Sequence, residues 1–70
     1  MLYDITIHNA QSDKDIVIAL DVTIIEIAQY KERLSITTSK VIAGEKIECE
    51  MRIPGSILIG KQIIIKAKNE

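Results

Sequence analysis

A strict alternation of apolar and charged residues over Lys46–Ile53 constrains the fold of this chain more than any other feature. Its apolar members are Ile47, Cys49, Met51 and Ile53. Because side chains alternate across a β-strand, a period of two places this set on one face. A strand with one dry and one wet face is typical of an antiparallel sheet or small barrel with a single core. Pro54-Gly55 then predicts a turn, since proline cannot donate to a strand ladder.

Three shorter segments alternate in the same way and predict further strands. They are Tyr3–Ile7, Leu34–Thr37 and Ile63–Ala67. The polar run Asn9–Lys14 predicts a turn that joins the first strand to the next segment as a hairpin. Ser39–Glu45 is expected to be a connection whose apolar pair, Val41-Ile42, covers the open end of the core.

The longest apolar stretch, Asp15–Ala28, changes the phase of its alternation at Ile24-Ile25. Such a change predicts a β-bulge or sharp bend in one long strand of a curved sheet. Two strands that meet at Asp21 are an alternative. A helix over Thr23–Leu34, which would give a β-grasp fold, is another, because its start has capping-box spacing. The β-branched run Val22–Ile25 favours the strand.

Composition agrees with an all-β chain. Sixteen of the 70 residues are isoleucine, which packs well on pleated surfaces, and Phe and Trp are absent. We therefore predict one domain over residues 1–70, a small antiparallel five- or six-stranded barrel or strongly curved sheet. A chain of this length buries only about 60% of its unfolded surface, which favours oligomerisation. The predicted core comprises Ile5, Ile7, Ile18, Leu20, Leu34, Ile36, Ile47, Cys49, Met51, Ile63 and Ile65.

The charges point to no strong nucleic-acid binder. The net charge is −1, with one Lys against five acidic residues in residues 1–30 and eight Lys/Arg against five Glu in residues 31–70. Strong nucleic-acid binding usually needs a concentrated basic field. The alternative function is nevertheless an OB-like nucleic-acid binder that uses this basic second half. Its candidate contacts are Tyr30, Lys31, Arg33, Lys61 and Lys66.

No motif for catalysis, metal binding or cofactor binding occurs in the sequence. Cys49 is the only cysteine and is expected to be a small buried hydrophobe. His8 is expected on the wet face of the first strand together with Asp4, while Asp13 and Asp15 are expected as solvated turn charges. We therefore expect no enzyme, no metal and no cofactor. The absence of a signal-peptide pattern and of a long apolar run leads us to expect a cytoplasmic protein.

Residues 21–67 resemble the PilZ family of small six-stranded β-barrels in the order and spacing of their segments. The matching segments are Val22–Ala28, a loop, Leu34-Ser35-Ile36-Thr37-Thr38, the turn around Gly44, the alternating Lys46–Arg52, Ile53-Pro54 and the closing Ile63–Ala67. The resemblance implies a small barrel.

The two motifs shared by PilZ domains that bind cyclic di-GMP are missing. The first, Arg-x-x-x-Arg, cannot be present because no arginine precedes Arg33. At the second, Asp/Asn-x-Ser-x-x-Gly, the chain has Glu26-Ile27-Ala28 and no following glycine in Gln29–Arg33. The guanidinium groups that would grip phosphates are absent. The resemblance therefore implies a member that does not bind the dinucleotide and acts through protein contacts.

The expected function is thus a non-catalytic interaction or assembly module, with a protein partner or a second copy of the chain. Four apolar residues have the wrong parity to face the core and are expected to point outward. They are Val17, Ala19, Leu58 and Ile64. Grouped apolar residues at a surface usually mark an interface.

Overall fold

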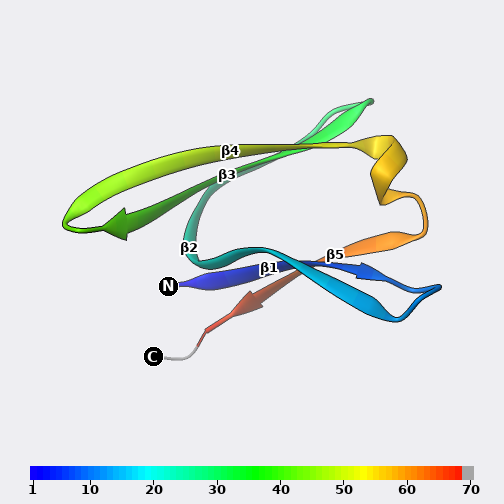
Figure 1. Cartoon of the computed structure of the whole chain (residues 1–70). Coiled ribbons are helices and arrows are strands. Elements are labelled where there is room, and N and C mark those ends of the chain that lie inside the picture. The colour runs from blue at the N-terminus through cyan, green and yellow to red at the C-terminus, as the bar shows by residue number, and fades with distance from the viewer. Residues whose placement is uncertain (69–70) are drawn as a thin grey trace.

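The computed structural model describes residues 1–68, which form a single five-stranded antiparallel sheet (Figure 1). Its elements are β1 (Tyr3–Asn9), β2 (Lys14–Gln29), β3 (Arg33–Ile42), β4 (Glu45–Pro54), the 3-10 helix η1 (Gly55–Leu58) and β5 (Lys61–Ala67). The strand order is β4-β3-β2-β1-β5. The predicted all-β fold class is confirmed, in its curved-sheet form. Within residues 1–68, β4 and β5 do not pair, so the sheet stays open instead of closing into a barrel.

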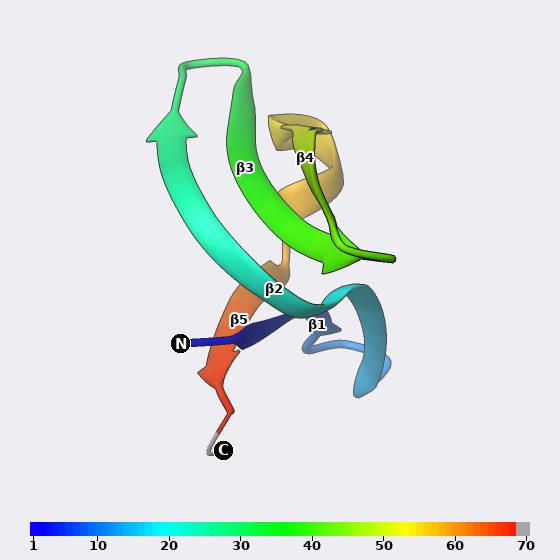
Figure 2. The same ribbon diagram turned by 90° about the vertical axis from the view of Figure 1, so that its left-hand side faces the viewer.

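The long strand β2 belongs to both halves of the sheet. Its first part pairs with β1 and its second part pairs with β3, so the ribbon curves between two crossing layers (Figure 2). A register shift between Ile24 and Glu26 leaves Ile25 unopposed, which confirms the predicted bulge. A second bend in β2 lies at Asp21, where the backbone is left-handed with a φ of 55°. The helical alternative over residues 23–34, and with it the β-grasp fold, is wrong.

The β3–β4 hairpin is longer than the sequence predicts. Ala43 and Gly44 have φ values of 52° and 80°, as a two-residue turn of the I′ type requires. Because this turn is so tight, Val41 and Ile42 continue β3 instead of forming a connection. They are 69% and 51% exposed, so the prediction that they cover the open end of the core is wrong.

The core is small and lies between the β1–β5 layer and the β3–β4 layer. Its buried hydrophobic residues are Ile5, Ile7, Val22, Ile36 and Ile53. Seven partly buried hydrophobics pack against them: Ile18, Ala19, Ile24, Leu34, Met51, Leu58 and Ile63.

Four residues predicted for the core are exposed, namely Leu20, Ile47, Cys49 and Ile65. The face assignment in β4 is correct, since Ile47, Cys49 and Met51 line one common groove. The opposing layer, however, does not extend over the far half of the β3–β4 hairpin. Burial along β4 therefore rises only toward Ile53, which is 9% exposed. The described part of the chain contains no helix long and apolar enough to cross a membrane.

The turn at Ala43 offers a test of the backbone. A left-handed conformation costs an L-residue roughly 1–2 kcal/mol, and Asn tolerates it better than Ala. We expect Ala43→Asn to raise the free energy of unfolding by up to about 1 kcal/mol in urea denaturation. The matched substitution Ala10→Asn lies in a turn at a position whose own φ is not left-handed, and it should change stability by less than about 0.5 kcal/mol. Equal effects at both positions would contradict this account.

Candidate functional site

An apolar groove opens on the concave side of the sheet, between the first half of β2 and the β3–β4 hairpin. It encloses about 270 Å³ and is lined by Ile18, Ala19, Leu20, Val22, Thr38, Lys40, Ile42, Ile47, Cys49 and Met51. Leu20 and Ile42 are each 51% exposed, and Ile47 is 46% exposed. Lys40 is the only charged residue in this lining. The groove can therefore receive apolar groups and offers little to a polar ligand.

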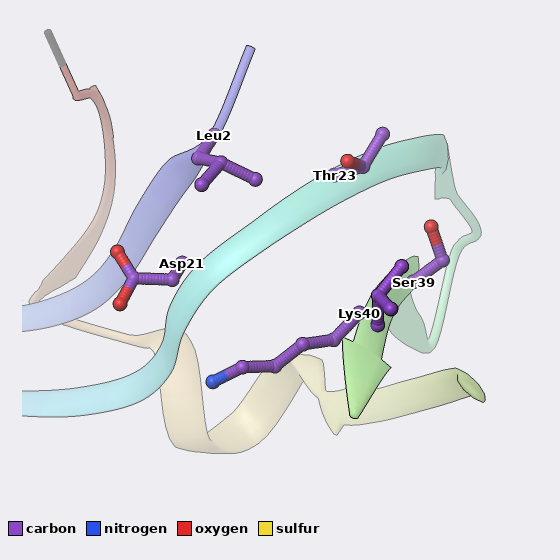
Figure 3. Close-up of a pocket in the computed structure, with 6 residues that line it drawn as sticks. Leu2, Asp21, Thr23, Ser39 and Lys40 are labelled. Atoms are coloured by element: carbon purple, nitrogen blue, oxygen red, sulfur yellow. The ribbon is translucent and has the colours of Figure 1, made fainter. Parts of the chain in front are cut away.

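Lys40 lines the groove at the point where β2 and β3 separate. The pairing of the two strands stops at Thr23 and Ser39, and Lys40 is the next residue of β3. Its Nζ donates to the backbone carbonyl of Leu20 at 3.1 Å. Figure 3 shows this side chain extending from β3 toward the bend of β2. The lysine thus donates to a carbonyl of β2 at a point where β3 no longer pairs with that strand, so its ammonium group is engaged beside the groove.

A second hollow of about 270 Å³ lies beside the bend of β2 (Figure 3). The Asp21 N–H donates to Asp4 Oδ1 at 3.1 Å. Lys68 Nζ bonds the Asp21 carboxylate and lies 3.6 Å from Asp4 Oδ1. The hydrogen bond and charge of Lys68 lower the pKa of Asp21, and the same bond raises the pKa of Lys68. This cluster fixes the left-handed backbone at Asp21 and is structural in character.

The two outer strands of the sheet, β4 and β5, have open edges of different chemistry. The outer face of β4 is charged: Lys46 Nζ lies 3.6 Å from Glu48, and Arg52 Nε donates to Glu50 at 2.8 Å. Arg52, and then the Ser35 hydroxyl that donates at 3.1 Å, lower the pKa of Glu50. The β5 edge carries the run Ile63–Ile65 followed by Lys66. Within residues 1–68 nothing pairs with either outer edge.

The structure brings together two of the four predicted interface residues. Thr6 of β1 opposes both Val17 of β2 and Ile64 of β5, so these residues form one row on the outer face. Val17 and Ile64 are 53% and 43% exposed. Ala19 and Leu58 are instead half-buried and pack against the core.

The predicted nucleic-acid contacts do not form a single basic surface. Tyr30, Lys31 and Arg33 lie at the β2–β3 connection, where the Arg33 guanidinium covers the Tyr30 ring at 4.4 Å from its centroid. Lys61 donates to the Ile57 carbonyl at 2.8 Å. The backbone of η1 bonds to this connection, so these four residues share one end of the molecule. Lys66 lies near the other end of β5, opposite Asp4.

The main partner of His8 is Asp15, next to the turn of the first hairpin, and not Asp4. It opposes Asp15 in the register, and its Nδ1 lies 2.6 Å from Asp15 Oδ1, while Nε2 lies 3.8 Å from Asp13. The alternation in the sequence predicts that His8 and Asp4 share one face of the strand, but the contact across the hairpin depends on the register. Residues 1–68 hold no group of three or more His, Cys, Asp or Glu placed to bind a metal ion.

Comparison of the chain with models of known families, with curated proteins and with solved structures gives no match. The resemblance to PilZ domains therefore stays a prediction. The groove itself was missed by sequence reasoning, because alternation identifies the inner face of β4 but not where the opposing layer ends.

The cluster at Asp21 predicts a loss of stability in acid. Its folded-state pKa is below the ordinary value of 3.8, so ionised Asp21 stabilises the fold fully above that value. The contribution is lost as the pH falls through 3.8 toward the lowered pKa. Urea denaturation from neutral pH downward should show wild-type stability falling, and a shallower fall for Asp21→Asn. The residual slope includes Glu50, whose pKa is also lowered.

Lys68→Met supplies the matched control for this cluster. It removes the partner that causes the shift, so the double variant with Asp21→Asn should lose little more stability than either single variant. Additive losses would show that the two residues act independently.

Proposed function

We propose that the chain is a non-catalytic assembly module that acts through protein contacts and associates with further copies of itself. One observation carries the proposal. Within residues 1–68, five hydrophobic residues are buried, whereas fourteen large hydrophobic residues are exposed. A 70-residue chain with so small a core has little stability to spare, and oligomerisation is a usual remedy.

The exposed hydrophobic residues are grouped and not scattered, and this grouping supports association. Leu20, Ile42 and Ile47 adjoin Cys49 in one groove, and Val17 and Ile64 share one row on the outer face. Contiguous apolar patches on soluble proteins usually mark interfaces, whereas single exposed apolar residues need no explanation. The exposed thiol of Cys49 supports the reducing cytoplasm as the location within this proposal.

The PilZ resemblance fits the same proposal without adding a ligand. The chain has no arginine before Arg33, so no guanidinium pair is available at the expected positions for the phosphates of cyclic di-GMP. We therefore keep protein contact, and not dinucleotide binding, as the function.

The solution mass tests the proposal directly. Light scattering should give a dimer or larger species, compared with 7.8 kDa for one chain. The mass should persist at roughly 0.5 M salt, where the Debye length is only a few ångströms, because the driving force is apolar burial. The unfolding midpoint should also rise with protein concentration. A monomer at every concentration would overturn self-association.

The nucleic-acid alternative makes the opposite set of predictions. A monomer that shifts a labelled single-stranded oligonucleotide in low salt, and releases it in high salt, would favour the basic second half. Lys31→Ala and Arg33→Ala should then weaken binding. Under the assembly proposal no such shift is expected.

A further inference from the structure

The open edges of the sheet define which surfaces two copies can bring together. β4 and β5 are its outer strands, and unpaired strand edges are templates for pairing with another chain. Three pairings are possible between copies: β4 with β4, β5 with β5, and β4 with β5. The charges and the exposed side chains discriminate among them. This inference rests on the proposed self-association and specifies its contact.

Pairing of β4 with a second β4 about Cys49 is opposed by its charges. The outer-face order of Lys46, Glu48, Glu50 and Arg52 reads the same in both directions. An antiparallel pair centred on Cys49 therefore sets Lys46 against Arg52 and Glu48 against Glu50, and directly opposed like charges destabilise a sheet. Moving the centre by one residue to Glu48 or Glu50 opposes that residue to its own copy, pairs a basic residue with a glutamate on either side, and leaves the β5 edge open with Ile64 and Ile65 exposed.

Pairing of β5 with a second β5 meets no charge repulsion but leaves the β4 edge unpaired. Centred on Ile64, it opposes Ile63 to Ile65 and Gln62 to Lys66, without like charges. It gains no charge pair, however. It also leaves the whole β4 edge open, with Ile47 and Cys49 exposed.

Pairing of β4 with β5 of a second copy satisfies both edges with one contact. In the antiparallel register that sets Glu48 against Lys66, Cys49 opposes Ile65 and Met51 opposes Ile63 on the inner face. Ile47 then opposes Ala67. Glu48 and Lys66 are both exposed, and the shift that would set Lys46 against Lys66 is opposed by like charge. The opposite shift, which sets Glu50 against Lys66, leaves Ile47 with no opposing residue in β5. Lys68, which would approach Lys46, is already engaged by Asp21 and Asp4.

We propose that copies of this chain associate edge to edge, β4 of one against β5 of the next, in the register Cys49–Ile65. Three exposed inner-face residues, Ile47, Cys49 and Ile65, each gain a directly opposed apolar neighbour in this way. The contact is heterologous, because it joins different surfaces of the two copies. Such contacts build closed rings or open filaments instead of stopping at a dimer.

The lone cysteine makes a sharp crosslinking test possible. Directly opposed residues on neighbouring strands have Cβ atoms about 4.5–5.5 Å apart, close to the separation that a disulfide bridges. Ile65→Cys gives every copy one thiol on each edge, so mild oxidation should join copies into a ladder of dimers, trimers and larger species. Ile63→Cys lies on the same face of the same strand but opposes Met51, and should give little or no ladder.

Each other outcome overturns the inference. Crosslinking of the wild type through Cys49 would indicate β4–β4 pairing, and an Ile65→Cys product that stops at the dimer would indicate a symmetric contact. Absence of any crosslink in a protein that light scattering shows to be oligomeric would exclude this contact while leaving the assembly proposal standing. A monomer by light scattering would overturn both.

A charge exchange provides a second test on exposed positions, should Ile65→Cys fold poorly. Glu48→Lys and Lys66→Glu each create a like-charge pair across the contact and should weaken association roughly two- to fivefold. The double variant should restore wild-type association. Asp4 opposes Lys66 within the chain, and its contact with a glutamate at that position persists in the double variant. Recovery therefore reports the contact between copies, and failure to recover would contradict the register.

Discussion

The left-handed backbone at Asp21 is the constraint on which the rest of this structure depends. It lies where β2 leaves β1 and turns toward β3, and one carboxylate, one lysine and one backbone N–H hold it there. Together with the bulge at Ile25, this bend curves the sixteen-residue strand β2 and gives its sheet an inner face. With it, the two layers meet over Ile5 and Ile36, both fully buried. The polar cluster therefore positions the apolar core, although the cluster itself lies outside the core.

The same bend explains why the core stops short. Beyond Thr23 and Ser39, β2 turns away while the β3–β4 hairpin runs on to its tight turn at Ala43. The inner face of that hairpin loses its opposing layer within a few residues. Lys40 fills the point of divergence and leaves an apolar groove behind it. Exposed isoleucine is thus a consequence of the topology and not of the composition alone.

The strands and their faces can be predicted from the sequence because both depend on local periodicity. The alternation over Lys46–Ile53 and the phase change at Ile24-Ile25 are local signals, and the structure confirms both. Burial depends on the other layer, which no single strand encodes. For that reason Cys49 was placed on the correct face and wrongly expected to be buried. The cross-strand partner of His8 and the left-handed Asp21 likewise depend on a register that the sequence alone does not fix.

The distribution of charge along the edges bears on the proposed assembly of this chain. The charge order of β4 reads the same in both directions and so opposes the pairing of two β4 strands about Cys49, whereas β5 carries three consecutive isoleucines followed by a lysine. Natural sheets commonly carry charged side chains on their open edges, which prevents pairing with other chains. Here the charge order opposes a β4 strand paired with its own copy about Cys49, and it permits the pairing of β4 with β5. Ile47 and Ile65 are exposed in the single chain, and the proposed pairing of β4 with β5 would give each of them an apolar neighbour from a second copy.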